Sequence, residues 1–130
     1  MESIQALHGK LIGYLKEGKF AEGIADFYHD DVVAQENADA PSHGRDAMVA
    51  AERQFLKKVT KYHGLDVHAT VVDDHGHGNG VVFYETTMKW EQNDRNGVVK
   101  TDQAVVERWK DGKISSIRFY GTYNPGPLPQ

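Results

Sequence analysis

The chain of 130 residues is long enough for one domain with one hydrophobic core. Its 15 basic and 19 acidic residues form no lysine and arginine block, which argues against nucleic acid or an anionic membrane surface as a partner. The absence of cysteine excludes disulfides, thiolate nucleophiles and cysteine metal sites. The N-terminus has no basic leader, and no segment approaches the roughly 18 apolar residues of a membrane span, so we expect a soluble, cytoplasmic protein.

Helical periodicity runs through the first half of the chain. Apolar residues recur at spacings of three and four over residues 4–15 and again over residues 20–28, which predicts two helices joined by a turn at Gly18. A loop rich in Asp, Pro, Ser and Gly follows at residues 37–44. A third helix is predicted after it, ending near residues 62–64 and carrying Met48, Phe55, Leu56 and Val59.

Beyond Gly64 the period changes from helical to alternating, which is typical of an α+β domain with an antiparallel sheet. Strands are predicted near residues 65–72, 80–91, 98–110 and 114–123. The pair Asp111-Gly112 is a strong signal for a short hairpin. We therefore predict a single domain over residues 1–123, followed by a tail at residues 124–130 that is rich in Pro and Gly.

The inward faces of these strands are expected to be apolar with a few polar points. Alternation places Tyr84, Thr86, Met88, Trp90, Thr101, Gln103, Val105, Glu107, Trp109, Ile117 and Phe119 on that side. Such a composition suits a small-molecule pocket, whose wall we expect to be formed by Tyr84, Thr86, Met88, Trp90, Val105, Trp109 and Phe119, with Phe55 from the third helix. The polar members could instead be tolerated residues near strand ends, a reading that we favour for Glu107.

The opposite face of the predicted sheet carries Phe83, Val106 and Tyr120 among charged neighbours. This face is more apolar than a solvated sheet surface needs to be. We therefore expect a homodimer that forms through the outer sheet face.

Glu36 is the best candidate catalytic residue in the chain. It follows an apolar stretch, and if that stretch is extended, Glu36 shares a face with Val32 and Ala34. Apolar neighbours disfavour the charged form of a carboxyl group, which lets it act as a base near neutrality. Alternatively, Glu36 simply begins the polar loop that follows.

The order of these segments resembles the nuclear transport factor 2-like superfamily over nearly the whole chain. The resemblance rests on two helices, then Tyr28-His29-Asp30-Asp31-Val32-Val33, then Gly44-Arg45-Asp46-Ala47-Met48 and a closing hairpin around Asp111-Gly112. Within that superfamily the chain is most similar to SnoaL-like and ketosteroid-isomerase-like members. The resemblance implies an α+β cone, in which a strongly bent antiparallel sheet wraps around three helices and leaves a deep apolar pocket.

The resemblance also implies site residues. Glu36 occupies the place of the aspartate base of ketosteroid isomerases, whereas the positions of the family's oxyanion donors hold Val105 and Leu11. Gln103 lies near Val105 and Tyr14 near Leu11, so either could point a hydrogen-bond donor into the same cavity from a shifted position. The chain is therefore not expected to be a steroid isomerase proper.

Histidines form the remaining candidate constellations. His29 and His43 flank the loop that bears Glu36, and His43 is the better candidate for an acid or orienting partner. His75-Gly76-His77 has the spacing of a metal clip, but a solvated hairpin turn is the favoured interpretation, and no metal site is predicted. No phosphate loop, dinucleotide fingerprint or serine-nucleophile elbow is present, so no cofactor is expected.

The leading functional hypothesis is a pocket for a small hydrophobic or polyketide-like carbonyl compound, with Glu36 abstracting a proton beside the carbonyl and Gln103 or Tyr14 stabilising the oxyanion. A catalytic protein of this kind would be a cofactor-independent isomerase, cyclase or dehydratase-type lyase, and epoxide opening is also open. Two alternatives remain: a binding module that does no chemistry, and an accessory module that acts through its outer sheet face.

Overall fold

A computed structural model describes residues 2–124 of the chain. The helices are α1 (Ile4–Lys16), α2 (Phe20–Phe27) and α3 (Arg45–Leu56). The strands are β1 (Tyr28–Glu36), β2 (Ser42–His43), β3 (Val59–Gly76), β4 (Asn79–Gln92), β5 (Val99–Lys110) and β6 (Lys113–Asn124). The predicted tail therefore lies outside the described residues, apart from Asn124, which ends β6.

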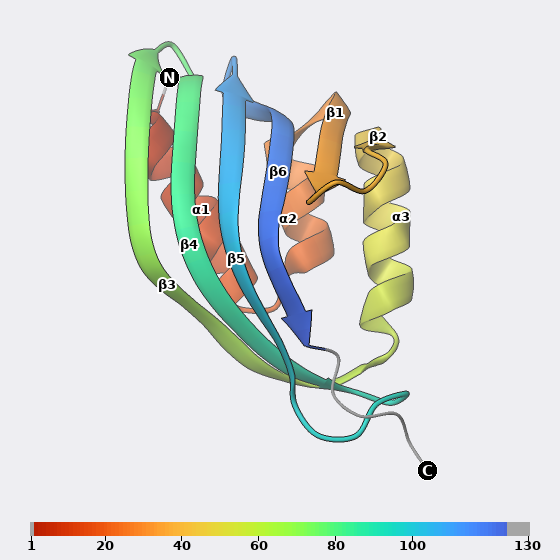
Figure 1. Ribbon diagram of the computed structural model, residues 1–130. Coiled ribbons are helices and arrows are strands. Elements are labelled where there is room, and N and C mark those ends of the chain that lie inside the picture. Colours follow the sequence, from red (N-terminus) through yellow and green to blue (C-terminus); the bar gives the residue numbers. More distant parts are fainter. Residues whose placement is uncertain (1, 125–130) are drawn as a thin grey trace.

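One bent sheet holds all six strands in the order β2-β1-β6-β5-β4-β3. Figure 1 shows α1 and α2 behind the sheet and α3 beside β1 and β2, while the lower parts of β3 and β4 curl toward the end of α3. This arrangement confirms the predicted α+β cone. The long strands β3 to β6 pair antiparallel as predicted, whereas β1 runs parallel to β6, so the sheet is mixed.

The third helix is shorter than predicted. It ends at Leu56, and β3 begins at Val59, where the prediction had the helix continuing to residues 62–64. The segment over residues 59–64 instead pairs with the end of β4, with Tyr62 opposite Trp90. Pairing with β4 decides its conformation, which a period of three or four from Phe55 to Val59 could not reveal.

Two tight turns hold the long strands in register. Asp111 and Gly112 link β5 to β6 with φ angles of 51° and 83°, which confirms the predicted short hairpin. His77 and Gly78 link β3 to β4 with φ angles of 56° and 77°. Both pairs lie in the left-handed region that a two-residue hairpin with the native sheet twist requires.

The hydrophobic core fills the part of the cone that α1 and α2 cover. Ile4 and Leu11 from α1 pack there against Val82, Val105 and Trp109 from the sheet. The predicted inward faces of β4 and β5 are confirmed, since their even and odd positions respectively are the buried ones.

A buried polar cluster lies within this core. Glu107 is fully buried and its Oε1 lies 2.7 Å from Nδ1 of His8, which is 5 % exposed. Trp109 donates from Nε1 to the same oxygen at 3.1 Å. Glu107 is thus a core residue with its own partners, and it does not line the cavity described below.

None of the helices within residues 2–124 combines the length and hydrophobicity that crossing a membrane demands.

Candidate functional site

A cavity of about 420 Å³ opens between the helices and the curled part of the sheet. We call it the apolar chamber. Its helical wall consists of Leu11, Leu15, Phe20, Ile24 and Phe55, and its sheet wall of Tyr28, Tyr84, Met88, Trp90, Ile117 and Phe119. Four polar residues complete the lining: Glu36, Glu52, Thr101 and Gln103. A mostly apolar wall with a few convergent polar groups is typical of small-molecule sites.

A second hollow of about 370 Å³ adjoins the chamber between β1, β2 and α3. We call it the acidic annex, because Gln35, Glu36, Asp39, Ser42 and Glu52 provide its polar lining. The chamber and the annex share Ile24, Tyr28, Glu36, Glu52 and Phe119. The two glutamates therefore lie at the junction of the two hollows.

Glu36 reaches this junction because β1 ends beside β6. Its register partner in the parallel pair is Phe119, which also lines the cavity. Directly after Glu36, Asn37 takes a left-handed conformation with φ 47° and donates its backbone N–H to the Phe119 carbonyl at 2.8 Å. Glu36 thus faces the cavity as predicted from the alternation, but its side chain is exposed and not enclosed among apolar groups.

The desolvated carboxyl group of the junction belongs to Glu52, which the sequence analysis missed. Burial raises the pKa of Glu52, and the neighbouring charge of Glu36 raises it further. A signal was present in the sequence, because Glu52 follows Met48 by four residues and precedes Phe55 by three, which puts a charge on the apolar face of the helix.

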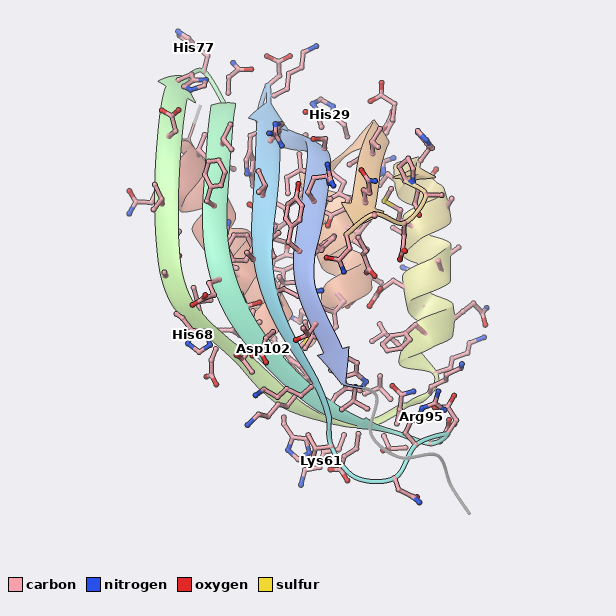
Figure 2. All side chains as sticks on the ribbon, viewed as in Figure 1. His29, Lys61, His68, His77, Arg95 and Asp102 are labelled. Carbon is pink, nitrogen blue, oxygen red and sulfur yellow. The ribbon has the colours of Figure 1, made fainter. Side chains whose placement is uncertain are left out.

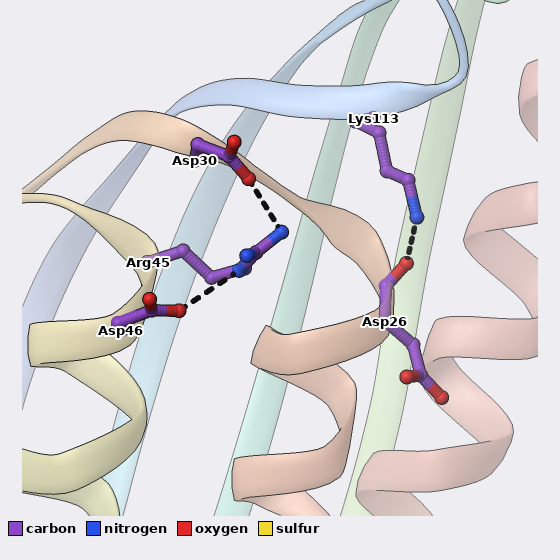
Figure 3. A network of polar contacts seen from close by, with 5 residues as sticks. All are labelled: Asp26, Asp30, Arg45, Asp46 and Lys113. Carbon is purple, nitrogen blue, oxygen red and sulfur yellow. Dashed lines mark hydrogen bonds and ion pairs between the residues drawn. The ribbon is translucent and has the colours of Figure 1, made fainter.

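Polar contacts link α3 and α2 to the neighbouring strands. Arg45, the first residue of α3, contacts Asp30 of β1 at 2.7 Å and Asp46 at 3.3 Å (Figure 3). Lys113 at the start of β6 donates to the backbone carbonyl of Asp26 near the end of α2 (Figure 3). These contacts tie α3 and α2 to the strands that position Glu36.

Two polar side chains of β5 face the chamber beyond the junction. Gln103 is half-buried, opposite Gly121 of β6, and its amide can donate hydrogen bonds. Thr101 is only 7 % exposed, and its buried hydroxyl has no hydrogen-bond partner among the described residues. Buried hydroxyl groups are normally paired, so Thr101 is a polar group in the cavity wall whose partner is missing within residues 2–124.

Two tyrosines of the chamber wall are held in their neutral form. Burial raises the pKa of Tyr84, and the nearby Glu107 raises it further. Burial likewise raises the pKa of Tyr28, followed by the charges of Glu107 and Glu52. Both phenols therefore stay protonated and can donate hydrogen bonds.

The predicted pocket residues separate into two groups. Tyr84, Met88, Trp90, Phe119 and Phe55 line the chamber. Thr86, Val105 and Trp109 are buried elsewhere and do not line it, with Val105 and Trp109 belonging to the hydrophobic core.

The candidates Tyr14 and His43 are not brought to the cavity. Tyr14 donates its hydroxyl to Asp26 at 2.8 Å, in an exposed position. His43 lies exposed in β2, where it pairs with Val33. Of the four predicted catalytic candidates, the structure therefore brings only Glu36 and Gln103 together around the chamber.

The histidine-rich turn lies far from the cavity. Figure 2 shows His77 at the tip of the β3–β4 hairpin, and His75 contacts Asp73 at 2.9 Å in an exposed position. Within residues 2–124, no group of three or more His, Asp or Glu side chains is arranged to hold a metal ion.

The outer face of the sheet carries a separate row of polar residues. His68 and Asp102 lie on the side turned away from the helices (Figure 2). They meet at Thr87, whose hydroxyl lies 2.8 Å from Nε2 of His68 and donates to Asp102 at 2.6 Å. This row lies outside the chamber and the annex.

Comparisons with solved structures show the fold. A Mesorhizobium loti protein named as a SnoaL-like polyketide cyclase is 20 % identical, with a TM-score of 0.63 over 92 % of this chain and 99 % of its own. An LEH-like epoxide hydrolase of M. tuberculosis is 17 % identical, with a TM-score of 0.70 over 90 % of this chain and 76 % of its own. A nuclear transport factor 2-like protein of Burkholderia xenovorans is 16 % identical, with a TM-score of 0.65 over 98 % of this chain and 86 % of its own.

These similarities confirm the nuclear transport factor 2-like architecture, and at such identities they show the fold alone. No curated protein sequence matches the chain significantly. The model of the SnoaL-like domain matches residues 12–117, which run from α1 into β6 and include every described cavity residue except Leu11 and Phe119. The chain therefore belongs to the SnoaL-like domain family.

Proposed function

We propose that the chain binds a small hydrophobic carbonyl compound in the apolar chamber. Glu36 accepts a proton from this compound, and Glu52 acts as the proton donor. The observation that carries this proposal is the pair of glutamates at the junction of the two hollows, one exposed and one desolvated. Carboxyl groups in unlike environments favour opposite roles, one as proton acceptor and the other as proton donor.

In the proposed reaction, the Glu36 carboxylate accepts a proton from the carbon beside the carbonyl group. The electron pair of the broken C–H bond forms a carbon–carbon double bond, and the carbonyl oxygen takes up the negative charge. Glu52, whose raised pKa favours its protonated form, donates to that oxygen, and the amide of Gln103 can provide a second hydrogen bond.

Two outcomes share this first step. In a substrate with a carbon–carbon double bond one carbon further from the carbonyl group, return of the proton to the far carbon of the dienolate gives isomerisation. Attack of the enolate carbon on a second carbonyl group in the same molecule gives cyclisation, and the oxygen of that second carbonyl group takes up the proton. One of the similar structures is named as a polyketide cyclase, which supports the proposal at the level of fold. A binding module without chemistry remains the competing function, and it requires only the chamber.

Hydrogen–deuterium exchange separates these functions. Beta-tetralone, a bicyclic ketone with exchangeable protons beside its carbonyl, is incubated with the protein in D₂O and followed by NMR. We expect Glu36→Gln to reduce the protein-catalysed exchange by about 100-fold or more, the contribution of a positioned base. Glu22→Gln, which removes one charge from an exposed position on α2, should leave it unchanged.

Exchange no faster than in buffer, or equal in the wild type and Glu36→Gln, would contradict the catalytic role. If calorimetry then detected binding of the ketone to the wild type, the competing function as a binding module would be the correct one.

The proposal includes a homodimer that forms through the outer sheet face. Val71, Phe83 and Tyr120 are 63 %, 48 % and 42 % exposed on that face. The register places Val71 beside Phe83 and Phe83 beside Val106, so an apolar row crosses three strands. Exposed apolar surface of this kind favours an isologous contact between two copies.

A further inference from the structure

We infer that the cavity selects an elongated amphiphile with an apolar ring system in the chamber and a protonated amine in the acidic annex. This inference deepens the proposed function by naming a substrate class, and it depends on the same cavity but not on the chemistry of Glu36. The negative charge of the annex excludes from the cavity compounds that end in a carboxylate or a phosphate.

The charge of the annex comes from its lining. Glu36, Asp39 and Glu52 line it, and the described residues provide no Lys, Arg or His to its wall. An anionic group placed there would be repelled by the carboxylates of Glu36 and Asp39, whereas an ammonium group would be attracted and could donate to them.

Two guanidinium groups of the flanking strands and helix have contacts outside the annex. Arg45 contacts Asp30 and Asp46, as Figure 3 shows. Arg118 donates from Nη2 to the backbone carbonyl of Asn37 at 3.1 Å and lies over the ring of Tyr120, 4.8 Å from its centroid. Neither guanidinium belongs to the annex wall, so the annex keeps its acidic character.

An independent observation indicates a ligand at the other end of the cavity. The buried hydroxyl of Thr101 lines the chamber and has no hydrogen-bond partner among the described residues. A polar atom of a bound molecule would satisfy it.

The register of the sheet gives the length of such a molecule. Glu36 is paired with Phe119, and Thr101 is paired with Tyr123, four residues further along β6. At about 3.4 Å per residue, the two ends are roughly 14 Å apart along the strand. A molecule that reaches both ends must therefore be elongated.

Three matched probes test the charge selection by isothermal titration calorimetry: naphthylbutylamine, naphthylbutanol and naphthylbutanoic acid. They share one ring system and a chain of four carbons, which in the acid includes the carboxyl carbon, and at neutral pH their ends are cationic, neutral and anionic. We expect the amine to bind at least tenfold more tightly than the acid, with the alcohol between them.

The variants locate the effect. Asp39→Asn and Glu36→Gln should each reduce the ratio of amine to acid affinity several-fold, because each removes a charge from the annex. Glu22→Gln removes the same charge from an exposed position outside the cavity and should leave the ratio unchanged.

Equal affinity for the three probes, tighter binding of the acid, or no binding of any probe overturns the inference. A ratio that is undiminished in both Asp39→Asn and Glu36→Gln also overturns it. Ketone exchange that depends on Glu36 would survive each of these results, so the two proposals fail separately.

Discussion

The side-chain amide of Asn37 forms a two-way bridge to the backbone of Gly121. Nδ2 of Asn37 donates to the Gly121 carbonyl at 3.1 Å, and Oδ1 accepts from the Gly121 N–H at 3.1 Å. This bridge imitates a pair of strand hydrogen bonds and extends the contact between β1 and β6 one residue beyond the end of β1. Because Asn37 follows Glu36 directly, the bridge fixes the place where the carboxylate enters the cavity.

Removing this bridge should cost stability and disturb the position of Glu36. We expect Asn37→Ala to lower the free energy of unfolding by about 1–2 kcal/mol, the usual worth of two hydrogen bonds. Asn37→Asp keeps the acceptor for the Gly121 N–H but sets a carboxylate oxygen against the Gly121 carbonyl, so it should also lower the free energy of unfolding. Urea unfolding measures both changes, and a wild-type midpoint and slope for Asn37→Ala would show that the bridge contributes nothing.

The Gly121 side of the bridge accepts no larger residue. A Cβ atom at this position would lie 2.0 Å from the backbone carbonyl oxygen of Asp102 on the neighbouring strand. Gly121→Ala must therefore shift β6 away from β5, and we expect a loss of about 1–3 kcal/mol, as for other overpacked sites. Thermal unfolding of Gly13→Ala, a helical position with nothing within 4 Å of the added atom, provides the control.

Glu52 makes stability depend on pH. Folding raises its pKa above the ordinary value of a glutamate, so the folded state holds the proton more tightly than the unfolded state. This contribution to stability is complete below the ordinary pKa and is lost as the pH rises through the raised one. Glu52→Gln cannot lose it, so the stability of the variant relative to the wild type should increase with pH across that range, as measured by urea unfolding.

The pKa of Glu52 should depend on the charge of Glu36. Because the charge of Glu36 contributes to the raised pKa of Glu52, Glu36→Gln should lower that pKa. A carbon-detected NMR titration of the glutamate side chains measures it directly. An unchanged titration of Glu52 would show that the two carboxyl groups do not interact.

Removing the buried hydroxyl of Thr101 should raise the stability of the free protein and weaken ligand binding. Thr101→Val preserves the shape of the side chain and removes a buried hydroxyl that has no partner in the described part of the chain. We expect the free protein to gain about 1 kcal/mol in unfolding free energy, since leaving such a group unsatisfied is costly. Affinity for beta-tetralone should fall if the hydroxyl pairs with the ligand. A variant that is less stable than the wild type would show that the hydroxyl is already satisfied.

The buried pair of His8 and Glu107 should contribute strongly to stability. His8→Leu removes a partner of the fully buried carboxyl group of Glu107, whose Oε1 still accepts from Trp109, and we expect a loss of about 3–5 kcal/mol. Glu107→Gln keeps an oxygen for both donors and should cost less. Equal losses in the two variants would show that the charge of Glu107 is not what His8 compensates.

The outer face should control the oligomeric state. Phe83→Asp places a charge in the apolar row and should convert a dimer into a monomer, as measured by size-exclusion chromatography with light scattering. His77→Asp introduces the same residue at an exposed turn and should leave the dimer intact. A wild-type protein that is monomeric at micromolar concentration would contradict the homodimer.

Much of the fold could be predicted from the sequence. The alternation from Tyr84 to Trp90 and from Thr101 to Trp109 identified the buried faces of β4 and β5 correctly, and Asp111-Gly112 identified their hairpin neighbour β6. These features depend on side-chain periods and turn geometry within a few residues, which local sequence determines.

The site depended on contacts between distant segments. The sequence placed Glu36 after an apolar stretch, but the parallel pairing of β1 with β6 brings it beside Phe119, and the packing of α3 brings Glu52 to it. The same holds for the inward side chains: α1 and α2 cover Val105 and Trp109 and make them core, while the curled end of the sheet leaves Trp90 and Thr101 facing a cavity. The sequence by itself therefore determined which faces of β4 and β5 are buried. Only the tertiary structure decided which buried residues face a ligand, because a cavity arises where packed elements leave space, and no local period records that space.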